Sequence, residues 1–337
     1  MKRWSAGALL GTIGISVGIW AVIALICLCV GSTGEVGWPE PGILPYRREL
    51  VLFASLVGAA LAAAGVAYQA ILRNPLADPY LLGVSSGAML FSYVWQFSFL
   101  TTWLALGQQA FAFVGALAAV AIVFLLASRR GRLEPVTLLL VGVIVNAVNG
   151  AIFLLLNALI KDPATPGGPL MFLVGGLQTN LRLGHPTVVS SAIIIAIGLV
   201  VLLALAGNLN VAILSEPEAQ ALGVRIHRLR WIALITASLI TASAVAISGP
   251  IGFIGLICPH LGRLIVGNDQ RRLLPIATAL GAALLAVADA ITRLLSRESS
   301  MNTTMPVGVL TGLLGGPFFL LLLYKARRRL AVSEGMA

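Results

Sequence analysis

The sequence predicts an all-α polytopic membrane protein with about ten transmembrane helices. Apolar residues make up 59% of the 337 residues and charged residues 10%, against roughly 25% charged in an average soluble domain. Because each bilayer crossing takes about 20 apolar residues, this content suits about ten spans. The composition excludes a soluble enzyme, a nucleic-acid-binding domain and a receptor with a single anchor.

Proline, glycine and charge clusters divide the apolar runs into ten candidate helices. Their approximate ranges are 6–30, 48–72, 81–100, 108–128, 134–160, 186–206, 229–249, 251–266, 272–296 and 305–324. The first run is longer than the apolar region of a signal peptide, so we interpret it as a retained helix. The eighth run is short and contains Gly252, Gly255 and Pro259, which suits a segment that crosses part of the bilayer inside the protein.

The basic residues orient these helices. With a cytoplasmic N-terminus, sixteen of the 22 Lys and Arg residues lie inside and six lie outside. This bias supports an even number of spans with both termini in the cytoplasm. The net charge of +10 therefore indicates which loops lie in the cytoplasm and does not indicate a nucleic-acid partner. We expect residues 1–337 to form a single transmembrane domain, with 207–230 as the longest inner segment.

A tight inner turn is predicted after the second helix. Asn74, Pro75, Asp78 and Pro79 stop that helix, because proline cannot continue it and Asn and Asp favour turns. The Gly and Ser residues that follow permit close helix approach.

The inner segment contains the pattern of a short, bounded helix. Ser215 with Glu218 three residues later forms a capping box, Pro217 suits the first turn, and Gly223 suits the position after the last turn. Its two acidic residues disfavour an anionic lipid surface, so we expect this helix to dock into a partner.

A polar stripe follows one face of the fifth helix. Asn146, Asn149, Phe153 and Asn157 are spaced by three or four residues and share that face. Three amides facing lipid would be costly. The stripe therefore contacts either neighbouring helices or a water-filled path, and the pattern leaves both open.

Charges also gather near the outer end. Asp289 and Arg293 are one helical turn apart in the ninth helix, which predicts an ion pair. Arg293 and Arg297, together with Arg47 and Arg48, could bind lipid phosphate or a protein that presents carboxylates.

Several kinds of chemistry lack support in the sequence. No lysine stands in a Walker A context, so any ATP is bound by another chain. The string Gly83-Val84-Ser85-Ser86-Gly87 matches a nucleophile elbow formally, but that motif needs a strand before the serine. Cys258 and His260 are too few ligands for an assigned metal geometry. We predict no catalytic residue and no metal site.

Several strings together resemble the FecCD/BtuC family, the type II permeases of bacterial ABC importers for ferric siderophores, haem and cobalamin. The resemblance spans nearly the whole chain, and the order and spacing of the strings make it specific. The strings are Val57–Ala62, Asn74–Ala88, Leu222-Gly223, Gly252–Arg263, Leu273-Leu274-Pro275, Pro306–Thr311 and Leu314–Pro317.

The resemblance implies a BtuC-like fold, a homodimer in the bacterial cytoplasmic membrane, and a substrate path along the dimer axis. A cytoplasmic ATPase dimer would carry ATP and Mg, and a periplasmic or lipid-anchored binding protein would deliver a metal chelate, most readily a ferric siderophore, with haem or cobalamin as alternatives. Path residues would be Asn146, Asn149, Phe153 and Asn157, and docking residues Arg47 or Arg48 and Arg293, with Arg297 nearby. The implied ATPase-coupling residues are Ser215, Glu216, Pro217, Glu218, Ala219, Leu222 and Gly223.

The chain departs from the family pattern in three places. Arg47-Arg48-Glu49-Leu50 replaces the usual Arg-Leu-Pro-Arg, Thr304-Met305 replaces a common acidic residue, and Ser215 and Pro217 alter the coupling segment. A rival function is ion-coupled secondary transport, which usually needs intramembrane carboxylates. Asp289 is the one acidic residue that lies away from the ends of a predicted span.

Overall fold

The computed structural model describes residues 6–31, 36–95, 108–129, 132–133, 135–159, 175–177, 184–214, 216–297 and 305–334. Ten helices of twelve or more residues account for most of this part of the chain, and each coincides with one of the ten predicted helices. They are α1 (Ala6–Leu28), α2 (Leu44–Ile71), α3 (Val84–Trp95), α5 (Gln108–Ala127), α6 (Pro135–Leu159), α8 (Pro186–Ala212), α10 (Ile226–Ser248), α11 (Ile254–Val266), α12 (Gln270–Arg297) and α13 (Val307–Glu334).

Two shorter helices complete the set. A 3₁₀ helix, η1 (Pro79–Leu82), precedes α3, and α9 (Glu216–Ala221) lies between α8 and α10. Seven of the described helices are long and apolar enough to cross a membrane. The predicted eighth helix exists as α11, and its 13 residues are too few to span about 30 Å of hydrocarbon alone.

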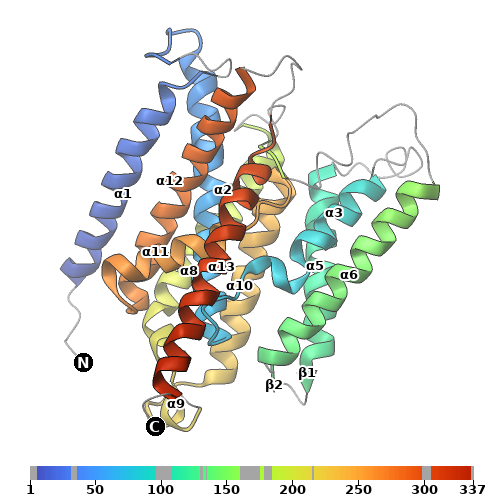
Figure 1. Ribbon diagram of the computed structural model, residues 1–337, viewed down its shortest axis with the longest axis vertical. Coiled ribbons are helices and arrows are strands. Elements are labelled where there is room, and N and C mark those ends of the chain that lie inside the picture. The colour runs from blue at the N-terminus through green and yellow to red at the C-terminus, as the bar shows by residue number, and fades with distance from the viewer. Residues whose placement is uncertain are drawn as a thin grey trace.

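The bundle is organised around α2, which is buried along most of its length. It packs against α12, α10 and α11, while α3, α5 and α6 form a group on the far side of α10 (Figure 1). Helix α1 lies at the edge of the bundle, against α12 and α2. It begins, and α13 ends, toward the end of the molecule where α9 lies, which we call the basic end. This arrangement agrees with the predicted even number of crossings.

Glycines bring three pairs of helices into backbone contact. A Cβ at Gly58 of α2 would collide with the carbonyl of Gly281 in α12, and one at Gly65 would collide with Gly255 in α11. Gly87 and Gly115 play the same role between α3 and α5. Small residues let helix backbones approach and pack closely inside a membrane. Gly255 thus lies in close contact with α2, whereas Gly252 has open space around it.

Several helix ends differ from the sequence prediction. Helix α13 runs to Glu334, ten residues past the predicted end at 324. Helix α8 continues six residues past the predicted end at 206, because Asn210 is anchored by α12: its amide donates to Asp269 and its oxygen accepts from the Gln270 N–H, both at 2.7 Å. Helix α2 begins at Leu44 with Pro45 in its first turn, where a missing N–H costs nothing.

The inner connection between α5 and α6 contains a small feature that the all-α prediction lacked. Two strands of two residues each, β1 (Ser128–Arg129) and β2 (Arg132–Leu133), pair antiparallel. Their pairing closes the turn between two neighbouring helices and leaves the helical architecture unchanged.

Candidate functional site

Helix α9 forms the most distinctive surface at the basic end. Ala219 is completely buried and anchors the helix to the bundle, while Leu222 is 55% exposed just beyond its last turn. The chain turns at Gly223, whose φ of 76° is the left-handed conformation typical of a helix C-terminal glycine. Ile213 and Leu214, on the other side of α9, are also exposed.

The structure describes only part of the capping box predicted for α9. Ser215 lies outside the described residues, and the backbone of Glu216 and Pro217 forms the first turn of the helix. Glu218 is exposed, and its carbonyl accepts from the N–H of Leu222 at 3.2 Å. The site therefore presents a carboxylate on one short helix and apolar side chains directly before and after that helix, outside the membrane-spanning part.

The polar stripe on α6 faces η1 and α3. Asn146 donates to the carbonyl of Tyr80 at 2.9 Å, and Asn149 donates to the hydroxyl of Ser86 at 3.0 Å. Of the two surroundings left open by the sequence, contact with neighbouring elements of the same chain is the one observed for these two amides. Buried amides need such partners.

The other half of the stripe contacts Tyr93 of α3. The Tyr93 ring lies edge-on to buried Phe153 with ring centroids 4.9 Å apart. Its hydroxyl donates to the side-chain oxygen of Asn157 at 3.4 Å. Asn157 is exposed at the side of the bundle, so it is the stripe residue that remains accessible to a molecule beside α6.

The turn between α2 and η1 is built by two side-chain caps. The Asn74 oxygen accepts from the Leu76 N–H at 3.0 Å, and the Asp78 carboxylate accepts from the Tyr80 N–H at 2.9 Å. Pro75 follows the first cap and Pro79 begins η1. Burial raises the pKa of Asp78 to about 6, while the hydrogen bond from Tyr80 lowers it.

Two of the outer arginines stabilise the end of α1. Arg47 is 5% exposed and donates to the carbonyls of Leu28 and Gly37, both at 3.2 Å. Arg293 is 6% exposed and donates to the Val30 carbonyl at 2.7 Å. Cations are favoured at helix C-termini because unpaired carbonyls gather there. Sequence reasoning missed this role, since α1 is distant from both arginines in the chain.

These contacts show which of the described outer arginines are buried and which are exposed. Arg293 also forms the predicted ion pair with Asp289, at 3.0 Å, so that prediction is confirmed. Arg48 is exposed beside buried Arg47, and the side chain of Arg297 lies outside the described side chains. Arg48 is therefore the described arginine of this set that an incoming protein could reach directly.

Tyr80 joins three elements and was not singled out from the sequence. Besides the contacts to Asp78 and Asn146, its hydroxyl accepts from the backbone N–H of Ile251 at 2.6 Å. A tyrosine beside a proline turn signals nothing by itself. The contact depends on residues 171 positions apart in the chain.

The weaker sequence motifs form no site. Ser85 is buried and Cys258 is a fully buried free thiol. His260 packs edge-on to Phe318 with ring centroids 5.6 Å apart. Among the described residues, no three His, Cys, Asp or Glu side chains are grouped to hold a metal ion.

Comparison with known proteins shows to which family the chain belongs. The model of the FecCD transport family matches residues 38–325, which include every described helix except α1 and the end of α13. The chain belongs to the FecCD transport family. As a FecCD protein it is the permease subunit of an ABC importer of the metal-chelate type, a transport subunit and not an enzyme.

Similar proteins cover nearly the same length. The hemin transport system permease HmuU of Yersinia pestis is 40% identical over 88% of this chain and 87% of its own. The cobalamin import system permease BtuC of Halobacterium salinarum is 38% identical over 82% of this chain and 72% of its own. A solved metal-chelate type ABC transporter in an inward-facing conformation has 29% identity and a TM-score of 0.80, covering 94% of this chain and 99% of that one.

Proposed function

We propose that this FecCD permease works as a homodimer in the cytoplasmic membrane of a bacterium, with an ATPase dimer at its basic end and a substrate-binding protein at its outer end. Its cargo is a bulky metal chelate, with a ferric siderophore as the first candidate and haem or cobalamin as the alternatives. ATP and Mg belong to the partner ATPase.

The surface of α9 carries this proposal. Exposed Leu222, Ile213 and Leu214 lie beside an exposed carboxylate, Glu218, outside the membrane-spanning helices. Apolar side chains in that position gain stability by docking into a protein partner. Closure of the ATPase pair would move α9, and α9 is tied to α8 and α10, so the motion reaches the bundle. Alternating access between two arrangements of the permease pair follows.

Substrate-stimulated ATP hydrolysis tests this mechanism. The chain, its ATPase and its binding protein would be reconstituted in nanodiscs and given a ferric siderophore, haem or cobalamin in turn. We expect one ligand to raise ATP turnover and the charge reversal of Glu216 and Glu218 to Arg to abolish the rise. Stimulation that survives this reversal, or a chain that never assembles with an ATPase, would contradict the proposal.

Gly223 offers a matched pair of variants for the same assay. The space around Gly223 is open, so a substitution acts through backbone strain alone. Asn tolerates the left-handed conformation and a β-branched residue does not. Gly223→Asn should therefore keep the coupled ATP turnover, while Gly223→Val should reduce it with little change in melting temperature.

The proposed path lies along α6 and α13, where a second copy would approach. The FecCD family resemblance supports a lining by Asn146, Asn149, Phe153 and Asn157. Of these, Asn157 is exposed while Phe153 is buried against Tyr93, so Asn157 supplies the proposed contact with the cargo. Amides and apolar groups suit the organic shell of a chelate and need not ligate its metal. Asn157→Leu should slow import, whereas the loss of Asn146 or Asn149 should also destabilise the contact with η1 and α3.

The outer end supplies the proposed docking contact. Arg48 is exposed there, while Arg47 and Arg293 hold the end of α1. Arg48→Glu should weaken capture of the binding protein, and an acid-to-Lys change in that protein should restore it. Arg228→Glu, an exposed arginine of α10 at the basic end, is the control and should leave capture unchanged.

A further inference from the structure

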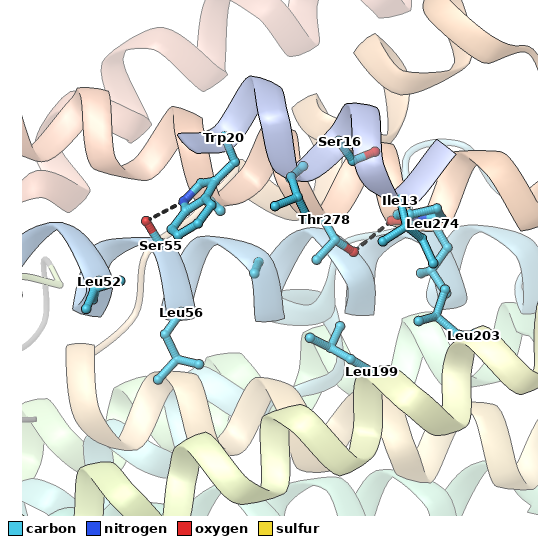
Figure 2. A pocket seen from close by; sticks show the side chains of 15 residues that line it. Ile13, Ser16, Trp20, Leu52, Ser55, Leu56, Leu199, Leu203, Leu274 and Thr278 are labelled. Carbon is cyan, nitrogen blue, oxygen red and sulfur yellow. Dashed lines mark hydrogen bonds between the residues drawn. The ribbon is translucent and has the colours of Figure 1, made fainter. Parts of the chain in front are cut away.

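An elongated apolar groove of about 390 Å³ lies between α1, α2, α8 and α12 (Figure 2). Helix α2 lies along its length, and α8 and α12 contribute side chains from either side of α2. A groove of this volume has room for a flexible chain of methylene groups.

The polar side chains that line the groove are engaged with protein atoms. Ser16 donates to the Thr12 carbonyl at 2.8 Å, and Thr278 donates to the Leu274 carbonyl at 2.7 Å. The indole N–H of Trp20 donates to Ser55 at 2.9 Å, as Figure 2 shows. The rest of the lining is apolar, so the molecule that fits must be apolar along its length.

The depth of the groove matches one leaflet of a bilayer. Along α12 it extends from Leu274 to Ala282, eight residues or about 12 Å at a rise of 1.5 Å each. Half of a hydrocarbon core of about 30 Å is about 15 Å. Leu274 lies just after the start of α12 at Gln270. Leu52, by contrast, lies in the half of α2 nearer its start at Leu44. The groove therefore runs from near the basic end toward the middle of the bundle.

A positive charge marks the inner mouth of the groove. The guanidinium group of Arg271 lies over Gly207 of α8, where an added Cβ would be 2.8 Å from Nη2. Gly207 is four residues beyond Leu203, which lines the groove, and Arg271 is three residues before Leu274 on the opposite wall. The cation is therefore held between α8 and α12 at the level where a lipid headgroup meets the acyl region.

We propose that this groove binds one acyl chain of an anionic phospholipid from the cytoplasmic leaflet and that Arg271 pairs with its phosphate. The basic end faces the cytoplasm by the positive-inside rule, and basic pockets between transmembrane helices bind anionic headgroups. Trp20, hydrogen-bonded to Ser55, lines the groove near its outer end. The bound chain fills the space between α1 and α8 and holds α1 on the bundle.

Native mass spectrometry of the full chain tests the proposal. The protein would be released from nanodiscs of equal parts phosphatidylglycerol and phosphatidylcholine with the same acyl chains. We expect one retained phosphatidylglycerol per chain. Ala279→Phe fills the groove and should remove it, while Ala204→Phe, at an exposed position of α8 away from the face of Leu199 and Leu203, should retain it. Equal retention in the two variants would overturn the acyl site.

A second pair of variants tests the headgroup. Arg271→Gln should lower the preference for phosphatidylglycerol about fivefold, the loss of roughly 1 kcal/mol for one basic residue at a membrane surface. Arg228→Gln is the matched control and should keep the preference. An unchanged preference in Arg271→Gln would overturn the phosphate contact.

Fluorescence gives a measurement that does not depend on the groove variants folding. Lipids with brominated acyl chains quench a nearby indole, and the contribution of Trp20 is the difference between wild-type and Trp20→Phe. Brominated phosphatidylglycerol should quench Trp20 at a lower mole fraction than brominated phosphatidylcholine. Equal quenching by both lipids would mean that Trp20 contacts bulk lipid, and it would contradict the proposal.

Discussion

The hydroxyl oxygen of Tyr80 accepts a hydrogen bond from the backbone N–H of Ile251 at 2.6 Å. This bond joins η1, which follows the turn after α2, to the segment that leads into α11. The carbonyl of the same tyrosine receives Asn146 of α6 at 2.9 Å. One residue thus links the central helix, the short helix α11 and the helix that carries the polar stripe.

Tyr80→Phe should lower the stability of the protein by about 1–3 kcal/mol, because the Ile251 N–H loses its partner inside the bundle. The measurement is the melting temperature in detergent by intrinsic fluorescence. Tyr93→Phe is the matched control: its hydroxyl bond to exposed Asn157 is longer, at 3.4 Å, so its effect should be small. Equal losses in the two variants would show that the Ile251 contact contributes little.

Gly65→Ala should strongly destabilise the bundle. The added methyl group would collide with the backbone of Gly255, and overpacking of this kind costs about 1–3 kcal/mol or more. The melting temperature should fall. Gly150→Ala on α6 meets open space and should leave it unchanged or raise it, because Ala favours a helix over Gly. A Gly65→Ala protein as stable as Gly150→Ala would contradict the close contact.

Removing one partner of the Asp289–Arg293 pair should cost about 3–5 kcal/mol, because the remaining charge is left buried. Asp289→Leu and Arg293→Met are the single variants, and the double variant should be more stable than either of them. The comparison is made on melting temperatures under identical conditions. A double variant whose loss equals the sum of the single losses would show that the two side chains do not interact.

Stability should depend on pH through Asp78. Its folded-state pKa of about 6 lies above the unfolded value of about 3.9, so the folded state holds the proton more tightly. The two states bind it equally below about pH 4, and stability falls as pH rises from there to about 6. Asp78→Asn keeps an acceptor for the Tyr80 N–H and cannot titrate. The melting temperature of wild-type relative to Asp78→Asn should therefore fall between pH 4 and pH 7, and a constant difference would contradict the raised pKa.

The features predicted correctly from the sequence are local ones. Ten apolar runs became ten helices, and Gly223 took the left-handed conformation that its place after α9 requires. The Asp289–Arg293 pair followed from a spacing of one helical turn. The end of α8 was placed too early, because Asn210 is held by Asp269 and Gln270, which are 59 and 60 positions away in the chain.

Less of the candidate site than of the fold could be predicted from the sequence. The pattern around Ser215 to Gly223 located a bounded helix, and α9 lies there. The burial of Arg47 and Arg293 against the end of α1 had no sequence signal, because the two arginines and the carbonyls they bind come from separate parts of the chain. The contacts of Tyr80 with Ile251 and Asn146, and the groove between four helices, also had no sequence signal.

The sequence alone determined the number and order of the helices, their orientation and the FecCD resemblance. Each of these depends on apolar length, basic residues at helix ends, or strings of adjacent residues. The tertiary structure decided which glycines meet, which elements receive the polar stripe, which arginines remain exposed, and where a lipid-sized space lies. Those outcomes depend on distances between residues far apart in the chain, and only the packing of α2, α6, α8, α11 and α12 sets these distances.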